Sequence, residues 1–351
     1  MKKTSFLPAV SLAVLSLVFS TVSPSYGGDE NSRGSEKNKS SELASTYDSK
    51  YWGTPSRDIT NSDDQSEYDR NQIAIPGIEV ASSEVFSVFP GRKASNAAAV
   101  VAGSGDLKDH GGTVLSEIHI YPIFWGPATT LTPAYTGAIT NFFSAIQCGG
   151  TAPACIGQSD LVKQYFRGAS SNSPIIKYVK SYTDTTNPPV SSPSTASIVA
   201  EAAKVVKAAA GDVLDTKGLY LVFTSNYPSR VKFCGWHSAG SYQPVRTTPA
   251  TWFTVSYMPY LGGTPGCSAS YLPRFNGFVN GQAVHSVINV ATHELFETMS
   301  DSVISNRSAW FDAAGFENGD KCAWNFGSTM AGYRVQSEYS NFHKGCPDLT
   351  S

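Results

Sequence analysis

The string HELFE at positions 293–297 combines residue types that bind metal ions and activate water. Residues four apart on a helix point the same way from successive turns, so His293 and Glu297 could both reach one ion. Glu294 would then lie next to a water molecule bound to that ion. The string is that of the H-E-x-x-H zinc helix with a carboxylate in place of the second imidazole. These residues predict a metal-dependent hydrolytic site.

Two acidic residues downstream could complete this site. Glu317 lies 20 residues after Glu297, which leaves room for the helix to end and for a second element to return a carboxylate. The arrangement resembles the gluzincin metalloproteases, in which the third ligand is a glutamate about that far along and a nearby aspartate holds a ligand. The resemblance implies His293, Glu297 and Glu317 as the metal ligands. Asp320 is either a hydrogen-bond partner that orients His293 or a competing third metal ligand.

The donor types bear on which ion is bound. Zinc takes three protein ligands and a water whose pKa it lowers towards about 7, and Glu294 is the expected base for that water. Two carboxylates and one imidazole make the site more anionic than the common zinc set, which weakens the Lewis acid or favours Mn²⁺ or Ca²⁺. We expect one Zn²⁺ ion. The alternative interpretation makes these acids the solvated face of a helix.

A further histidine, His237, ends the string FCGWH at positions 233–237. It could face the metal and stabilise an oxyanion, as histidines do in zinc peptidases. It could equally be a loop residue packed beside a Cys234 disulfide, and the sequence does not choose. His285 lies eight residues before His293, about 12 Å along a helix. That distance is too great for the two histidines to share an ion.

The elements that must position these residues follow from the pattern of apolar residues. Residues 279–301 carry apolar side chains at helical spacing, which predicts a buried amphipathic helix. The order of the other segments, strand, helix, strand, helix, strand, predicts a mixed α/β sheet packed by helices. Strands are expected at 114–125, 175–182, 219–224 and 252–260, and helices at 132–147 and 195–210.

The first 110 residues divide into three parts. Residues 1–27 have a positive start and a run of about fourteen mostly apolar residues, which predicts a signal peptide and is too short for a membrane anchor. Residues 28–70 form a polar, charged tract that we interpret as a disordered leader. Residues 71–110 contain short apolar runs and are either a pro-segment or an N-terminal extension of the domain at 111–351.

The composition of the chain excludes some classes of binding partner. The chain has 26 Lys and Arg against 28 Asp and Glu, a net charge of −2 without a basic cluster, so we expect no nucleic-acid partner. No later apolar run could anchor it in a membrane. Six cysteines in an exported chain favour disulfides over metal thiolates. Cys148 with Cys155 is the pair that proximity favours, and the other pairings stay open.

Several strings, taken in order, resemble the phosphate-induced protein 1/EXORDIUM family of secreted plant proteins and its microbial relatives. The resemblance covers about 111–326 and implies a secreted protein, in plants linked to cell-wall and growth responses, with a zincin-like helix at its centre. It implies no settled activity. The chain departs from the family pattern at Phe124-Trp125 and Asn318, neither of which involves a proposed ligand. The strings are GGTVLSEIHIYPIFWG (111–126), FCGWH (233–237), VINVATHELFETMSD (287–301), AWFD (309–312) and ENGDKCAW (317–324).

Together these observations predict a secreted, monomeric α/β (α+β) protein of zincin-like type, with a mixed sheet around a central metal-binding helix. Its expected activity is hydrolysis of extracellular peptides or proteins, with Glu294 and His237 as catalytic residues. The alternative is a non-catalytic protein that keeps the metal for structure and binds cell-wall glycan. The 17 Tyr and six Trp could supply faces that stack on sugars.

Overall fold

A computed structural model places the part of the chain that contains the expected site. The expected signal peptide (1–27) and polar leader (28–70) lie outside the described residues, as does most of 71–110. No helix in the described part is both long enough and apolar enough to cross a membrane. The described residues are 78–80, 87–90, 104–168, 173–210, 214–228, 233–242, 251–268, 280–302 and 308–351.

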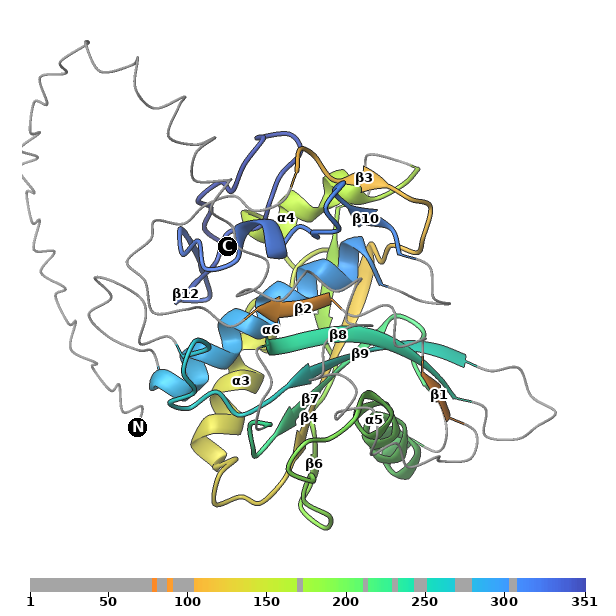
Figure 1. Ribbon diagram of the computed structural model, residues 1–351, viewed down its shortest axis with the longest axis vertical. Coiled ribbons are helices and arrows are strands. Elements are labelled where there is room, and N and C mark those ends of the chain that lie inside the picture. The colour runs from red at the N-terminus through yellow and green to blue at the C-terminus, as the bar shows by residue number, and fades with distance from the viewer. Residues whose placement is uncertain are drawn as a thin grey trace, which may run out of the picture. The chain divides into compact units, whose positions relative to one another are not determined.

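The fold is mixed α/β and is built on one eight-stranded sheet (Figure 1). Its central part is parallel, because β4 pairs with β5, β6 and β7, and β7 pairs in turn with β9. Each parallel pair requires a crossover, which the intervening helices and loops supply. These strands are β4 (Glu117–Trp125), β5 (Ile175–Tyr178), β6 (Tyr182–Asp184), β7 (Gly218–Thr224) and β9 (Thr251–Met258).

One side of the sheet is antiparallel. Strand β8 (Phe233–Tyr242) pairs with β9, and its outer edge carries two short strands, β1 (Ile78–Val80) and β2 (Ser87–Pro90). Part of the segment 71–110 is thus built into the sheet. Two small ribbons complete the strands: β3 (Lys108–Asp109) with β10 (Trp310–Phe311), and β11 (Ser328–Met330) with β12 (Tyr333–Val335).

Helices cover both faces of the sheet. Along β7, Leu219 and Phe223 pack in the core that includes α3 (Pro133–Ala145) and α6 (Gln282–Ser300). Tyr220 and Val222 pack on the opposite face, with α5 (Thr195–Ala210). The alternation follows from the period of two in a strand, and the continuous apolar run of β7 reflects burial on both sides. The result is three layers, with α5 on one side of the sheet and α6 on the other (Figure 1).

The expected elements are found with small shifts at their ends. Helix α3 begins as predicted, with Thr132 Oγ1 accepting from Tyr135 N at 3.2 Å and Pro133 in the first turn. Strand β4 starts at Glu117, later than the expected 114–125, and the expected strand at 175–182 is divided into β5 and β6. Helix α6 fills most of 279–301 and follows Gly281.

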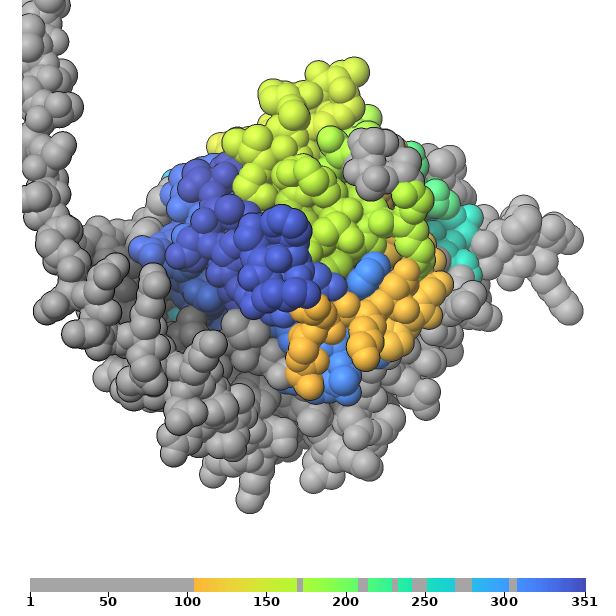
Figure 2. Space-filling view, turned by 90° about the horizontal axis from the view of Figure 1, so that it is seen from above, coloured from red at the N-terminus to blue at the C-terminus, as the bar shows by residue number. Residues whose placement is uncertain are grey.

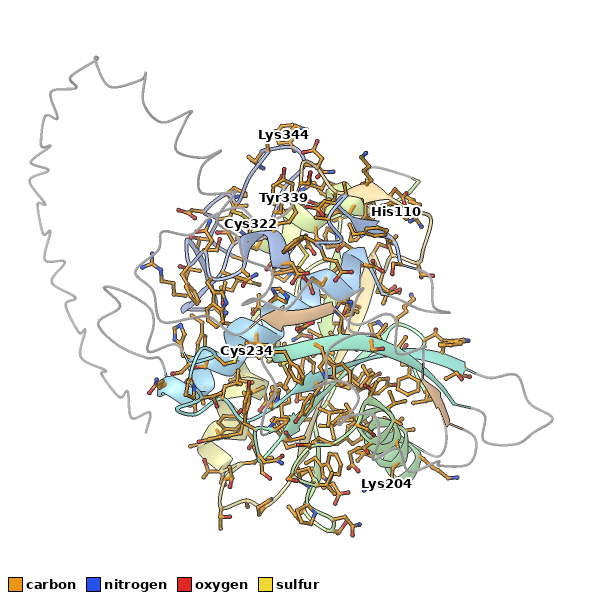
Figure 3. The ribbon with its side chains drawn as sticks, viewed as in Figure 1. His110, Lys204, Cys234, Cys322, Tyr339 and Lys344 are labelled. Atoms are coloured by element: carbon orange, nitrogen blue, oxygen red, sulfur yellow. A yellow bond between two sulfur atoms is a disulfide. The ribbon has the colours of Figure 1, made fainter. Side chains whose placement is uncertain are left out.

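All six cysteines form disulfides. Cys148 pairs with Cys155, which confirms the pair expected from proximity. Cys234 of β8 pairs with Cys267 and ties the antiparallel side of the sheet to the loop after β9; Figure 3 labels this cysteine. Cys322, in the short 3₁₀ helix η5 (Asp320–Cys322), pairs with Cys346. Three disulfides are consistent with an extracellular protein.

The segment that begins at Ser104 packs against the C-terminal segment, as Figure 2 shows. Leu107 and Asn341 are joined by two hydrogen bonds, of 2.9 Å and 2.8 Å, and His110 N donates to Ala309 O at 2.7 Å. These bonds hold the loops around η5 in place. The loop between β10 and η5 carries Glu317, so its anchoring fixes a residue of the expected site.

Candidate metal centre

Helix α6 carries three residues of the candidate site, His293, Glu294 and Glu297, and every residue from Val284 to Ser300 is buried. The apolar residues of this helix fill the core between the sheet and α3. A helix buried in this way must find partners for its polar side chains inside the protein, because unpaired buried charges are costly.

His293 lies beside the carboxylates of Glu297 and Asp320. Its Nε2 atom is 3.1 Å from Glu297 Oε1 and 3.8 Å from Asp320 Oδ1. The backbone N–H of Asp320 donates to the same Glu297 oxygen at 3.0 Å. Gly319 allows this approach, because a Cβ at that position would come within 2.5 Å of His293 Nδ1. Helix η5 can therefore come close to α6 only with glycine there.

His237 reaches the same site from strand β8. Its Nδ1 atom is 3.0 Å from Glu294 Oε2 and 3.5 Å from Glu297 Oε2. Its Nε2 atom is 3.0 Å from the backbone oxygen of Asp301 and 4.0 Å from Glu317 Oε2. His237 thus stands in a strand and not in a loop, and its ring lies between the acids of α6 and Glu317.

The structure brings all six predicted site residues together in the interior. Their exposed fractions are 0% for His237, His293, Glu294 and Glu297, 3% for Glu317 and 2% for Asp320. Their potential ligand atoms form two groups, each within 4.8 Å: His237 with Glu297 and Glu317, and His293 with Glu294 and Glu297. Glu317, which we expected beside His293, is grouped with His237, whereas Asp320 is the acid near His293.

The two histidines hold protons tightly. Burial lowers the pKa of His293, but the negative charge of Glu297 and its hydrogen bond outweigh this effect and raise the pKa to about 10. Burial also lowers the pKa of His237, and hydrogen bonds to Glu294 and Glu297 raise it well above its usual value. A metal cation that replaced these protons would be attracted by the same negatively charged carboxylates.

The acids differ in their pKa values. For Glu297, burial raises the pKa, but the two histidines overcome this and hold it well below the usual range. Burial raises the pKa of Glu317, and the charges of Asp301 and Glu297 raise it further. Burial and the charge of Glu297 likewise raise the pKa of Asp320. Glu297 is therefore the acid most strongly held as a carboxylate.

The donor set fits a divalent metal ion. Imidazole nitrogens and carboxylate oxygens are ligands that zinc and manganese share, and carboxylates alone suit calcium. Two buried oxygens, Glu294 Oε1 and Glu317 Oε2, have no hydrogen-bond partner. Buried carboxylate oxygens without donors are the atoms that a cation would satisfy.

Three further residues of the site were not predicted. Asp301 follows the last residue of α6, and its backbone oxygen accepts from His237. Gln336 Nε2 lies 2.9 Å from His293 Nδ1 and 2.9 Å from Gly319 O. Glu338 is 1% exposed, and burial raises its pKa well above the usual value. No spacing or motif connects 336–338 with α6, so the sequence offered no signal for them.

The remaining histidines lie elsewhere. His119 lies in β4 between the carboxylates of Asp215 and Glu117, at 2.5 Å and 3.0 Å. His285 lies in α6 with Nε2 2.8 Å from Arg334 O and belongs to neither group. His110 and His343 are exposed.

Comparison with known proteins adds no assignment: none of the family models, curated proteins or solved structures searched matches this chain. The function is therefore argued from the residues of the buried centre.

Proposed function

We propose that this protein is a secreted metal-dependent hydrolase, and specifically a zinc peptidase with a gluzincin-like HExxE helix in an EXORDIUM-like chain. The observation that supports this most strongly is the meeting of two histidines and four carboxylates in one buried cluster. These are His237, His293, Glu294, Glu297, Glu317 and Asp320, and each is at most 3% exposed.

His293 and Glu297 would hold the ion, with Asp320 or Glu317 as the third ligand. When bound, the metal would polarise a substrate carbonyl and lower the pKa of a water. The residues of the chain supply the proton transfer. Glu294 Oε2 lies against His237 Nδ1, whereas Glu294 Oε1 has no hydrogen-bond partner. Oε1 is thus the oxygen positioned to accept a proton, and His237 fixes the orientation of this base.

Burial also gives Glu294 a proton affinity that suits its proposed role as a base. Burial raises the pKa of Glu294, and the hydrogen bond from His237 partly opposes that rise. A base is most effective when its pKa lies near the working pH, which an exposed glutamate cannot reach. The buried position of Glu294 therefore makes it a stronger base than an exposed glutamate.

The pairing of β2 with the outer edge of β8 favours a peptide as the substrate. Strand β2 pairs antiparallel with the outer edge of β8, with Ser87 opposite His237, and it also contacts α6 and η5 (Figure 1). The edge of β8 beside the metal residues therefore accepts extended backbone, which is how many proteins receive peptides. We propose that a substrate pairs with this edge in the same way. Residues 71–110 would then act as a pro-segment, because β2 occupies the edge.

Glu294→Gln tests the proposed function directly. The amide keeps the shape of the side chain but is not a base, so we expect bound metal to be retained and peptide hydrolysis to fall by about 10²- to 10⁴-fold. Glu201→Gln is the matched control, because Glu201 is also a buried helical glutamate, 4% exposed, on the other face of the sheet. Unchanged hydrolysis in Glu294→Gln would remove Glu294 from the mechanism.

A further inference from the structure

The two oxygens of the Glu297 carboxylate face different histidines. Oε1 lies 3.1 Å from His293 Nε2, and Oε2 lies 3.5 Å from His237 Nδ1. A carboxylate placed in this way can donate one oxygen to each of two cations. Both groups of potential ligand atoms contain Glu297, and it is the only residue that the two groups share in the described part of the chain.

Each side of Glu297 has its own set of donors. On the side of His293, the group is completed by Glu294, and Asp320, which belongs to neither group, has Oδ1 3.8 Å from Nε2. On the side of His237, the group is completed by Glu317, whose buried Oε2 has no hydrogen-bond partner. Each side therefore offers one imidazole, one oxygen of Glu297 and one further carboxylate. Three protein ligands are the number that a metal position with an open site requires.

The number of carboxylates around the two histidines is sufficient for two ions. Four carboxylates pair with the two histidines: those of Glu294, Glu297, Glu317 and Asp320. With the imidazoles neutral, as ligands must be, these carboxylates carry a formal charge of −4, and one divalent cation leaves −2 in the interior. Two divalent cations neutralise it. Buried charge without compensation is costly, and it is removed either by a second cation or by protonation of acids such as Glu317 and Asp320, whose pKa values burial raises.

The surroundings of each ring fit a role as ligand. His237 Nε2 can donate to Asp301 O at 3.0 Å, which leaves Nδ1 without a proton, at 3.0 Å from Glu294 Oε2 and 3.5 Å from Glu297 Oε2. Gln336 Nε2 lies 2.9 Å from His293 Nδ1 and donates to Gly319 O at 2.9 Å, so the amide holds this ring in place on the side away from Nε2. Contacts of this kind orient the histidines that bind metals.

From these contacts we propose that the centre is dinuclear. Glu297 bridges two divalent cations, one held with His293 and Asp320 and the other with His237 and Glu317, and Glu294 lies beside both as the base. The inference rests on the proposed metal-dependent function and adds a second ion to it. His237 then acts as a metal ligand through Nδ1, which replaces both the oxyanion role expected from the sequence and the hydrogen bond that orients Glu294 when no second ion is bound.

Binding of Mn²⁺ to the metal-stripped full-length secreted protein tests this. Equilibrium dialysis against Mn²⁺ should give two equivalents per chain. The electron paramagnetic resonance spectrum should show the exchange-coupled signal of two bridged Mn²⁺ ions. His237→Ala and Glu317→Gln should each bind one equivalent and lose the coupled signal. His285→Ala, a buried histidine of α6 outside both groups, should keep two equivalents.

The outcomes separate the two proposals. One equivalent in the wild-type protein, lost in His293→Ala and kept in His237→Ala, would overturn the dinuclear centre and leave the mononuclear hydrolase in place. No bound Mn²⁺ or Zn²⁺ in the wild-type protein would overturn both. If His237→Ala fails to fold, the wild-type stoichiometry and spectrum still decide, because neither depends on a variant.

Discussion

His237 of strand β8 lies 3.0 Å from Glu294 of helix α6, through Nδ1 and Oε2, although 57 residues separate them in sequence. The contact joins the antiparallel edge of the sheet to the helix that carries HELFE. Because β2 pairs with β8 opposite His237, the edge that β2 occupies lies beside the cluster of histidines and carboxylates.

Gly319→Ala should damage the metal centre without straining the backbone. Gly319 has φ −71°, which alanine adopts easily, but its Cβ would lie 2.5 Å from His293 Nδ1 and 2.9 Å from Glu297 Oε1. Both side chains would have to move, so we expect metal affinity to fall by about 10- to 100-fold, measured by competition with a zinc chelator. Gly137→Ala in α3 is the matched control, because its Cβ meets nothing within 4 Å. Equal affinity in both variants would contradict the close approach of η5 to α6.

Removal of β2 after folding should increase peptide hydrolysis. A protease site placed between 91 and 103 would allow residues up to that point to be cut from the folded, purified protein. If β2 occupies the edge that receives substrate, cleavage followed by separation should raise kcat/KM for peptides by tenfold or more. The fragment added back should inhibit. Equal activity before and after separation would show that this edge does not receive substrate.

Glu201→Gln should alter the pH dependence of stability. Burial raises the pKa of Glu201 to about 7, although the ion pair with Lys204 partly opposes this. Because its unfolded pKa is about 4.5, the folded state holds the extra proton between these values, and its contribution to stability is lost as pH rises towards 7. The glutamine variant should therefore gain about 1–2 kcal/mol relative to wild type between pH 5 and pH 8. Urea unfolding at both pH values measures this, and a difference that does not vary with pH would argue against the raised pKa.

Loss of the Cys322–Cys346 disulfide should weaken both stability and metal binding. The bridge closes 24 residues and begins in η5, two residues after Asp320, whereas Cys148–Cys155 closes only seven residues and lies away from the centre. Replacing both cysteines of the longer loop by serine should lower the free energy of unfolding by about 2–4 kcal/mol. The same change in the shorter loop should cost about 1 kcal/mol less. Chemical denaturation and zinc competition should show that only the first pair affects metal affinity. A similar zinc affinity in both double variants would mean that the bridge does not position η5.

The residues of α6 could be predicted because their signal is local. Helical spacing of apolar residues defines the helix, and a spacing of four puts His293 and Glu297 on one side of it. The return of Glu317 and Asp320 was predicted only as a distance along the chain. Which histidine each acid approaches depends on how the loop before η5 packs, and that packing is set by contacts with the segment at 104–112.

The strand that carries His237 was not predictable from the sequence, and the reason is a different one. The sequence of β8, FCGWHSAGSY, is rich in glycine and serine and lacks the alternation typical of strands. It is held as a strand by its pairing with β9 on one side and with β1 and β2 on the other. Likewise, Gln336 and Glu338 reach the site only through the tertiary fold, which no periodicity reveals.

The metal content of the purified, secreted protein is the most direct test of the account. Elemental analysis of the wild-type chain, beside His293→Ala prepared in the same way, should find zinc in the wild-type protein and a loss of at least one equivalent in the variant. Manganese or calcium in place of zinc would keep the centre and change the ion. A wild-type protein that holds no metal after reconstitution would contradict the centre, and the alternative of a non-catalytic glycan-binding protein would then be preferred.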